Sequence, residues 1–229
     1  MLKVENFGVS YGQSKIIENL SFAARPNETL AIMGRNGMGK TTLFKSLMGV
    51  IPSFAGSVKL GDQEIAGMRS CQRVASGIAY VPQGRLIFPT LTVLENIETG
   101  LETAASKRIS DDIFALFPVL FDMRRRKGGN LSGGQQQQLA IARALASDPK
   151  VLLLDEPTEG IQPSIIKDIA KALNEIRKMR DITIIVSEQV LSFTLDVADR
   201  LLVIERGKFV HEDLRANVDA KKISEYLSV

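Results

Sequence analysis

A glycine-rich segment at residues 34–42 carries the most specific chemistry in the sequence. It fits the phosphate-binding pattern G-x-x-x-x-G-K-[ST], and its residues are Gly34, Arg35, Asn36, Gly37, Met38, Gly39, Lys40, Thr41 and Thr42. Glycines let a loop turn several backbone N–H groups toward one anion, and a following helix start adds partial positive charge. Lys40 can bind the outer phosphates, and the Thr41 hydroxyl can bind Mg²⁺. An ordinary glycine turn between a strand and a helix is the alternative, which the surrounding sequence disfavours.

Two adjacent carboxylates, Asp155 and Glu156, follow an apolar segment at residues 151–154. Such a segment predicts a buried strand, and parallel α/β sheets bind ligands beyond the carboxyl ends of their strands. There Asp155 can hold Mg²⁺ through water, and Glu156 can orient and deprotonate an attacking water. The alternative is an acidic turn, which we rate lower because a phosphate loop lies upstream.

Two further segments have polar groups suited to the same reaction. Gln83 ends a predicted strand at residues 78–81, and its neutral amide can contact the metal or the water. The second segment offers a hydroxyl, two glycines and a helix start, which together predict another anion site; it comprises Leu131, Ser132, Gly133, Gly134 and Gln135. Two phosphate-binding sites in one chain imply two bound anions, or two copies that share each nucleotide.

The remaining sequence predicts the elements that position these groups. Apolar runs alternate with helical segments and predict an α/β fold: a mainly parallel sheet with helices on both faces. Residues 2–24 predict an N-terminal antiparallel β layer, and residues 201–211 predict a hairpin around Arg206-Gly207. We predict one nucleotide-binding domain over 1–229, with its core at 1–84 and 149–229 and an inserted helical subdomain at about 85–148.

Local signals mark the helices within that insert. Capping boxes predict helix starts at Thr92, with Glu95 three residues on, and at Ser132, with Gln135. A helix is also expected over residues 110–117, where Pro118 should stop it.

Composition limits the class of protein. The 229 residues are 45% hydrophobic, which suits a sizeable core, and the net charge is only +3. One cysteine, Cys71, and one histidine, His211, permit neither an internal disulfide nor a Cys/His zinc cluster. The N-terminus lacks a signal-peptide pattern, and no apolar run approaches the ~20 residues that a membrane span needs. We therefore expect a soluble protein whose membrane association comes through a partner.

The ordered set of phosphate loop, Gln83, LSGGQ at 131–135 and LLLDEPT at 152–158 resembles the ATP-binding subunits of ABC transporters, over the whole chain. The resemblance implies the P-loop NTPase core, ATP and Mg²⁺, and hydrolysis with Lys40, Gln83 and Glu156 in the catalytic site. Thr41, Gln83 and Asp155 would arrange the metal, and Tyr11 would stack on adenine. From position alone, a half-buried strand tyrosine is the simpler interpretation of Tyr11.

The same resemblance implies an assembly. The segment at Ser132–Gln135 would close over ATP held by a second ATPase subunit, paired head to tail. The segment after Gln83 would receive a helix from one of two transmembrane permease subunits, which places the chain at the cytoplasmic face of the membrane. A solute-binding protein outside the cell would be an indirect partner.

Three segments give a closer resemblance. Residues 80–93 are similar to the branched-chain amino acid importer group, and residues 34–40 and 155–166 are similar to its urea-importer branch. We therefore favour the second ATPase subunit of a urea importer, with a branched-chain amino acid importer as the alternative. The solute never touches this chain, so that choice rests on analogy.

The chain departs from the family pattern at two positions. Gln189 stands where these ATPases usually carry a switch histidine, and Gln162 lies near the position of a usual aspartate. Glutamine can hydrogen-bond a γ-phosphate but cannot accept a proton at neutral pH. We therefore expect a heterodimer with a different ATPase subunit and two unequal sites, although a homodimer stays open.

Two other classes of function remain to be weighed. A soluble ABC ATPase acting on nucleic acid or ribosomes has some support in the pI near 9.0 and the basic run at 124–127. Such proteins usually carry two nucleotide domains or a long coiled-coil insert, which this chain lacks, so we expect no nucleic-acid partner. A non-catalytic regulatory binder is disfavoured by Lys40, Asp155 and Glu156.

Overall fold

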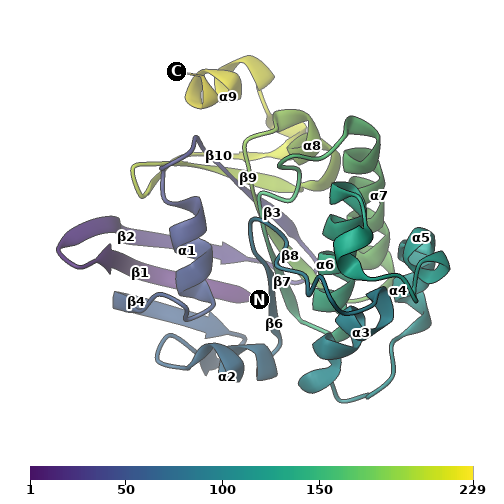
Figure 1. Cartoon of the computed structure of the whole chain (residues 1–229). Helices are drawn as coiled ribbons and strands as arrows, with labels where there is room; N and C mark the ends of the chain where they lie inside the picture. The colour runs from purple at the N-terminus through teal and green to yellow at the C-terminus, as the bar shows by residue number, and fades with distance from the viewer. Residues whose placement is uncertain (229) are drawn as a thin grey trace.

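The computed structural model describes residues 1–228, which form two β-sheets with helices packed between and beside them (Figure 1). The first sheet is antiparallel in the order β2-β1-β4-β5. Its strands are β1 (Leu2–Tyr11), β2 (Ser14–Ala24), β4 (Ser53–Leu60) and β5 (Gln63–Glu64). The ladder between β1 and β4 shifts register between Glu5 and Gly8. The predicted N-terminal antiparallel layer is thus confirmed.

The second sheet has the order β10-β9-β3-β8-β7-β6, and its neighbours pair in parallel except for β9 with β10. Its strands are β3 (Thr29–Met33), β6 (Ile78–Val81), β7 (Val151–Asp155), β8 (Thr183–Glu188), β9 (Arg200–Glu205) and β10 (Lys208–Leu214). The predicted hairpin turns at Arg206 and Gly207, with φ of 46° and 75°. Both angles are left-handed, as a two-residue hairpin turn of the right twist requires.

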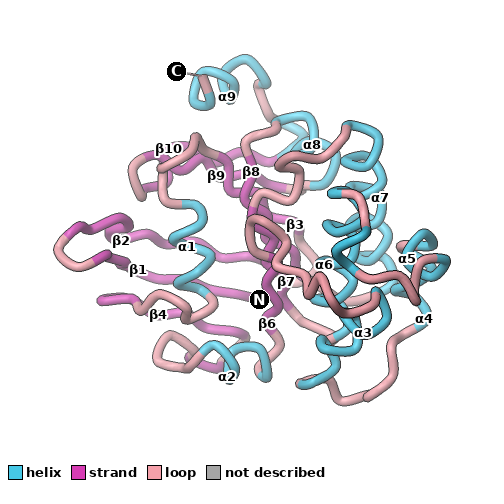
Figure 2. Tube along the Cα trace, in the orientation of Figure 1, coloured by secondary structure: helices cyan, strands magenta, loops and turns pink. Residues whose placement is uncertain are grey.

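Helices α6 and α7, with 14 and 17 residues, are longer than the other helices described (Figure 2). They are α1 (Lys40–Leu47), α2 (Ser70–Ala75), α3 (Val93–Glu98), α4 (Asp111–Leu116), α5 (Pro118–Asp122), α6 (Gly133–Ala146), α7 (Pro163–Met179), α8 (Leu191–Val197) and α9 (Ala220–Leu227), with 3-10 turns at Thr99–Glu102, Gly128–Asn130 and Arg215–Asn217. Both predicted capping boxes are present, at Thr92 and at Ser132.

Helix α4 ends just before Pro118, as predicted. Pro118 is also the first residue of α5, a helix that was not predicted. A proline at the first helical position loses nothing, because its missing N–H would have no partner there. The chain therefore ends one helix and starts another at the same proline.

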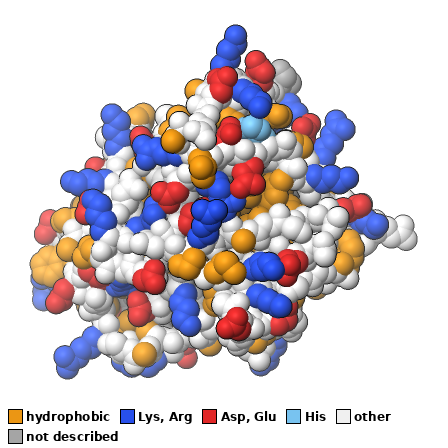
Figure 3. Space-filling view, turned by 180° about the vertical axis from the view of Figure 1, so that it is seen from behind, with side chains coloured by type: hydrophobic (Ala, Val, Ile, Leu, Met, Phe, Trp, Pro, Cys, Tyr) orange, Lys and Arg blue, Asp and Glu red, His pale blue; other side chains and the backbone are white. Residues whose placement is uncertain are grey.

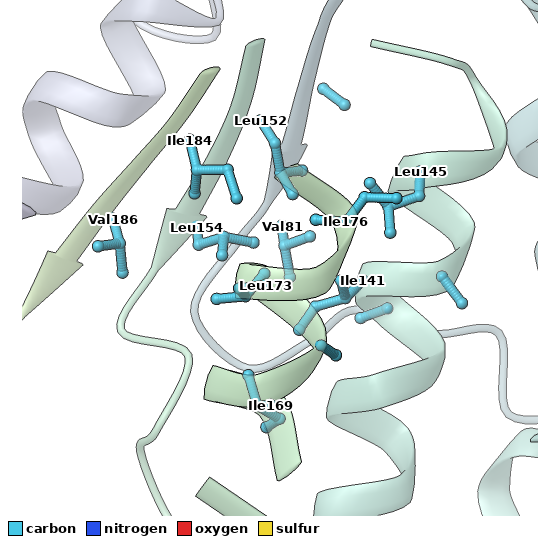
Figure 4. Packing of buried hydrophobic residues seen from close by; sticks show 14 of the residues in the cluster. Val81, Ile141, Leu145, Leu152, Leu154, Ile169, Leu173, Ile176, Ile184 and Val186 are labelled. Atoms are coloured by element: carbon cyan, nitrogen blue, oxygen red, sulfur yellow. The ribbon is translucent and has the colours of Figure 1, made fainter. Parts of the chain in front are cut away.

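The mainly parallel sheet divides the core in two, because alternate side chains of a strand point to opposite faces. On β7, Val151 and Leu153 face the cluster shared with α1 and the antiparallel sheet, whereas Leu152 and Leu154 face the cluster shared with α6 and α7. Figure 4 shows the second cluster, with Ile141 of α6 and Ile169, Leu173 and Ile176 of α7 around these leucines.

Helix α6 thus belongs both to the helical segment 85–148 and to the layer that covers the sheet. The limits of the subdomain at about 85–148 stay a prediction. Within residues 1–228, no helix combines the length and the apolar character needed to cross a bilayer.

Charges of both signs are interspersed on the molecular face in Figure 3. A surface that binds nucleic acid typically carries a stripe or patch of basic side chains, which differs from the mixed charges on this face.

Candidate nucleotide site

The phosphate loop runs from the end of β3 to the start of α1, as its sequence predicts. Gly37 and Gly39 have φ of 80° and 106°, in the left-handed region that glycine adopts without strain. Gly39 precedes α1 and provides no side-chain cap, so the first N–H groups of the helix are left for an anion. The loop lines a cavity of about 390 Å³ together with groups from β2 and the loops after β6 and β7. Its lining comprises Ile16, Asn36, Gly37, Gly39, Lys40, Thr41, Thr42, Gln83 and Glu156.

Lys40 lines this cavity. Its Nζ donates hydrogen bonds to the carbonyl oxygens of Gly34, at 2.6 Å, and Arg35, at 3.0 Å. It also lies 3.0 Å from Oε1 of Glu156, and the two side chains are only 3% and 7% exposed. Removing either partner would leave a buried charge without its counter-ion, which costs several kcal/mol. The residue that could hold phosphate and the residue that could activate water are therefore ion-paired to each other.

Asp155 lies at the end of β7 and accepts three hydrogen bonds. Thr41 and Ser187 donate to its Oδ1 at 3.2 and 2.6 Å, and Tyr80 donates to its Oδ2 at 3.0 Å. Burial raises the pKa of this carboxyl, the three hydrogen bonds offset part of the rise, and the charge of Glu156 adds to it. Burial, followed by the charge of Asp155, also raises the pKa of the Tyr80 phenol.

Sequence reasoning missed Ser187 and Tyr80. They lie on β8 and β6, the two neighbours of β7 in the sheet. A polar residue at the end of each predicted parallel strand was the available signal, but the order of the strands could not be known.

Glu156 follows Asp155 with a left-handed φ of 48°. Its N–H donates to the carbonyl oxygen of Ser187 at 3.0 Å. A non-glycine residue in this conformation costs about 1–3 kcal/mol and persists where the surroundings hold it. The turn aims the carboxylate away from the strand, toward Lys40, Gln83 and Gln189.

Gln83 and Gln189 bind different oxygens of the Glu156 carboxylate. Nε2 of Gln83 donates to Oε2 of Glu156 at 3.3 Å, and Nε2 of Gln189 donates to Oε1 at 3.1 Å. The Gln189 amide also donates to Oδ1 of Asn36 in the phosphate loop, at 2.8 Å. The structure thus brings Gln189, which the sequence placed after β8, directly to the phosphate loop.

Glu188 supports this end of β8 and was not predicted. It is 2% exposed, and burial raises its pKa, offset in part by hydrogen bonds from the residues around it. Its Oε1 accepts from the hydroxyl and N–H of Thr158, and its Oε2 accepts from the N–H groups of Gln189 and Val190. This carboxylate joins the loop after β7 to the loop after β8.

The predicted anion-binding segment at residues 131–135, called the signature segment below, lies at the start of α6 and outside the phosphate cavity. Ser132 and Gln135 cap the helix reciprocally, with Oγ of Ser132 accepting from N–H of Gln135 at 3.4 Å. Ser132 is exposed, whereas Gly134 is buried against Ile165 of α7. Leu131, Ser132, Gly133, Gly134 and Gln135 are not among the residues that line the phosphate cavity.

Tyr11 is also outside the lining of the phosphate cavity, and its side chain is 50% exposed. Ile16, from the next strand, lines the cavity instead. The adenine-stacking role of Tyr11 therefore stays a prediction.

The donors around Thr41 suit magnesium. Within residues 1–228, no group of three or more His, Cys, Asp or Glu side chains is placed to hold a metal ion. Mg²⁺ is usually bound by one or two protein oxygens, with phosphate oxygens and waters completing its six ligands. The Thr41 hydroxyl and the Asp155 carboxylate, which are hydrogen-bonded to each other, fit that requirement, and Gln83 lines the same cavity as Thr41.

The comparisons with known proteins agree with this geometry. The model of the ABC transporter family matches residues 17–159. This chain belongs to the ABC transporter family. It is an ATP-binding subunit, an ATPase that uses ATP with Mg²⁺, as its resemblance to the family implied.

Relatives cover nearly the whole chain. The high-affinity branched-chain amino acid transport ATP-binding protein BraG of Pseudomonas aeruginosa is 36% identical over 94% of each chain. The branched-chain amino acid transport ATP-binding protein LivF of Archaeoglobus fulgidus, described as probable, is 34% identical over 91% of this chain and 89% of its own. The lipopolysaccharide export system ATP-binding protein LptB of Haemophilus influenzae is 33% identical over 92% and 89%.

Solved structures have the same fold. An ATP-binding cassette of an ABC transporter, MJ1267, aligns with a TM-score of 0.84 at 26% identity, over 100% of this chain and 99% of that one. A dimeric cassette bound to ADP and phosphate aligns with a TM-score of 0.83 at 23% identity, over 94% and 99%. The predicted fold class of this ATP-binding subunit is confirmed.

These comparisons do not show the predicted solute, urea. Two of the relatives named above serve branched-chain amino acid transport, and none of these relatives is a urea transporter subunit. The comparisons favour the alternative that the sequence left open over urea.

Proposed function

We propose that this ATP-binding subunit powers an importer for branched-chain aliphatic amino acids. The similarity to BraG over 94% of each chain is the observation that carries the proposal. The family already gives ATP hydrolysis, so the proposal concerns the solute, the partners and the roles of single residues.

The residues of the site divide the work of hydrolysis. Lys40 and the N–H groups of the loop hold the phosphates, and Thr41, Asp155 and Gln83 arrange the metal site. Bound Mg²⁺ neutralises charge on the β- and γ-phosphate oxygens. Glu156 accepts a proton from the attacking water on a carboxylate oxygen, and Gln189 donates a hydrogen bond to the γ-phosphate.

The ion pair between Lys40 and Glu156 gives binding a direct consequence. A phosphate that takes the ammonium of Lys40 competes with Glu156 for it. Glu156 is then free to face water while Gln83 and Gln189 still bind its two carboxylate oxygens. When nucleotide binds, Lys40 thus exchanges Glu156 for phosphate, and the same exchange releases Glu156 to act as the general base.

The site is completed by a second ATPase subunit. Ser132 is exposed at the start of α6 and does not line the cavity of its own chain, which suits contact with nucleotide on a partner. A different subunit is favoured because Gln189 cannot take up a proton as a histidine would.

An apolar groove suits the permease. A hollow of about 690 Å³ lies between α1, α2 and the segment after β6, and Val50, Leu86 and Phe88 at its edge are 59%, 67% and 47% exposed. Exposed apolar clusters of this kind mark protein contacts, and an amphipathic helix of a permease subunit is the proposed occupant. Docking there would hold the chain at the cytoplasmic face of the membrane, with a solute-binding protein on the other side.

Urea is the second candidate solute. The sequence similarity of residues 34–40 and 155–166 to the urea branch supports it.

Uptake by whole cells distinguishes the two. Cells lacking this chain, given back the wild type or Glu156→Gln, are assayed with radiolabelled leucine and with radiolabelled urea. We expect wild type alone to restore leucine uptake, with Glu156→Gln at least 100-fold slower in ATP turnover yet still binding ATP. Restoration of urea uptake without leucine uptake would replace the proposed solute, and full turnover by Glu156→Gln would remove Glu156 from its role.

A further inference from the structure

The loop that carries Gln83 is held in a strained conformation. Gly84, Arg85 and Leu86 have φ of 80°, 68° and 47°, three left-handed residues in succession. The N–H of Leu86 donates to the carbonyl oxygen of Gly84 at 2.7 Å, which closes a three-residue turn around Arg85. This form of turn is rare and strained, and leucine is one of the residues that left-handed backbone disfavours. Something outside the turn must hold it.

Glu159 is bound by this loop at two points. Nε2 of Gln83 donates to its Oε2 at 3.0 Å, and Nη2 of Arg85 donates to its backbone oxygen at 3.2 Å. The carbonyl oxygen of Arg85 in turn accepts from Nη2 of Arg143 on α6, at 3.3 Å. Two of these bonds hold Arg85, at the centre of the turn, by its guanidinium and by its carbonyl oxygen, and the third holds Gln83.

The same contacts reach the general base. The Gln83 amide nitrogen donates to Glu159 at 3.0 Å and to Glu156 at 3.3 Å, so two carboxylates share one amide. Glu159 itself is joined to Glu156 through its N–H, which donates to the Glu156 carbonyl oxygen at 3.2 Å. Without Glu159, the amide would have one anchor instead of two.

The contacts also reach the start of α6. A Cβ on Gly133 would lie 3.2 Å from Nη1 of Arg85, so the guanidinium packs directly against the signature segment. Arg85 therefore touches the loop after β7 with one nitrogen and lies against the signature with the other.

We propose that Glu159 is a positioning residue for ATP hydrolysis: its carboxylate holds the Gln83 amide beside Glu156, and through Gln83 it tethers the loop that contains the turn at residues 84–86. The role needs a hydrogen-bond acceptor at the end of the side chain and no charge. Glutamine can supply that acceptor through its carbonyl oxygen, and alanine cannot. The proposal does not depend on the solute, because it concerns only hydrolysis by this chain.

The test compares Glu159→Ala with Glu159→Gln in the full chain within its assembled complex, with Glu18→Ala as the control at another exposed glutamate, on β2. We expect Glu159→Ala to lower kcat about 10-fold with the KM for ATP unchanged within about twofold, since displacing a catalytic group by 1 Å can cost up to 10²-fold. Glu159→Gln and Glu18→Ala should keep the wild-type kcat.

Limited trypsin digestion gives a second readout that needs no turnover. The bond after Arg85 lies within the strained turn, and loss of the contact between Gln83 and the carboxylate should speed its cleavage in Glu159→Ala, because cleavage follows local opening. The backbone oxygen of residue 159 can still accept from Arg85 in this variant, so the increase should be smaller than in Arg85→Lys. Arg85→Lys keeps the trypsin site but loses the forked donor, and should also be cleaved faster. Wild-type kcat and cleavage in Glu159→Ala would overturn the proposal. So would a kcat in Glu159→Gln as low as in Glu159→Ala, because charge and not the hydrogen bond would then be responsible.

Discussion

At the scale of single residues, the site brings together charged groups that are almost inaccessible to solvent. Lys40 and Glu156 are nearly buried, and Asp155 is 1% exposed. Low exposure strengthens their interaction with phosphate and metal, but it also makes each unpaired charge costly to the fold. Activity and stability should therefore respond in opposite directions at Asp155.

Asp155→Asn should stabilise the nucleotide-free chain. Burial raises the pKa of Asp155 above its unfolded value, so at neutral pH the ionised carboxylate destabilises the folded state. The asparagine oxygen can still accept from Thr41 and Ser187, and the Tyr80 hydroxyl can turn to accept from the amide. We expect the Tm to rise by about 3 °C, which is roughly 1 kcal/mol for a chain of this size.

The measurement is thermal unfolding without nucleotide, paired with ATP binding with and without Mg²⁺. The variant should lose the magnesium-dependent part of the affinity. Tyr80→Phe is the control and should lower the Tm, because it removes a hydrogen-bond donor and leaves the charge. A lower Tm in Asp155→Asn would contradict the account.

At the scale of elements, the site depends on which strand ends and helix starts meet at one edge of the sheet. Adjacent strands β6, β7 and β8 deliver Tyr80, Asp155 and Ser187 to the same place because they run parallel. Helices α6 and α7 pack against one face of this sheet and hold the signature segment in place relative to the loop after β7. The two helices pack closely at Gly134, since a Cβ there would lie 2.7 Å from Cγ2 of Ile165.

Gly134 should therefore have a structural role that can be separated from nucleotide contact. Gly134→Ala should lower the Tm of the isolated chain, although alanine is the better helix former by about 1 kcal/mol. In the background of Ile165→Ala, which opens the space, the same change should raise the Tm. Thermal unfolding of the four variants in a cycle measures this coupling.

Ser132→Ala is the matched variant for the signature, because it loses only a helix cap, about 1 kcal/mol. If Ser132→Ala lowers turnover in the assembled complex, the loss can be assigned to the missing contact with nucleotide. A bulky residue at Gly134 does not allow that assignment, because it also disturbs the packing of α6 on α7. Equal effects of Gly134→Ala in both backgrounds would contradict the packing role.

At the scale of the whole molecule, one buried arginine connects the two sheets. Arg200, at the start of β9, donates to Glu28 before β3, to Glu212 on β10 and to the carbonyl oxygen of Ala23 on β2. The side chains of Arg200 and Glu28 are only 10% and 8% exposed. This contact lies away from the nucleotide, so its loss should affect folding more than chemistry.

The stability of the chain should fall in acid through Glu28. Burial pushes the pKa of Glu28 up, but hydrogen bonds from Arg200 and from the Arg25 N–H, with the nearby positive charges, outweigh it and leave the pKa below the usual 4.5. A carboxyl with a lowered folded pKa stabilises the fold above its unfolded pKa, and that contribution is lost as the pH falls through the folded value.

Glu28→Gln should therefore lower stability by about 3 kcal/mol at pH 7, as expected for a broken buried pair. The difference from wild type should shrink below about pH 4. Urea unfolding at a series of pH values measures it, and a difference that stays constant down to pH 3 would exclude Glu28 as the source.

Several features of the protein could be determined from the sequence because they depend on neighbours along the chain. The phosphate loop, the capping boxes at Thr92 and Ser132, and the alternation of buried strands with helices are local patterns, and the structure contains them all. The helix that starts at Pro118 was not predicted, because the same residue is compatible with the end of one helix and the start of the next.

Only the tertiary structure decided which distant groups meet. Tyr80 and Ser187 reach Asp155, Gln189 reaches Asn36, and Glu159 is held by Gln83 and Arg85 because strand order and loop path bring together segments that are up to about 150 residues apart. Hydrogen-bond partners from distant strands leave no pattern in the sequence. Helix caps and phosphate-binding loops do leave a pattern, because their geometry is set within a few consecutive residues.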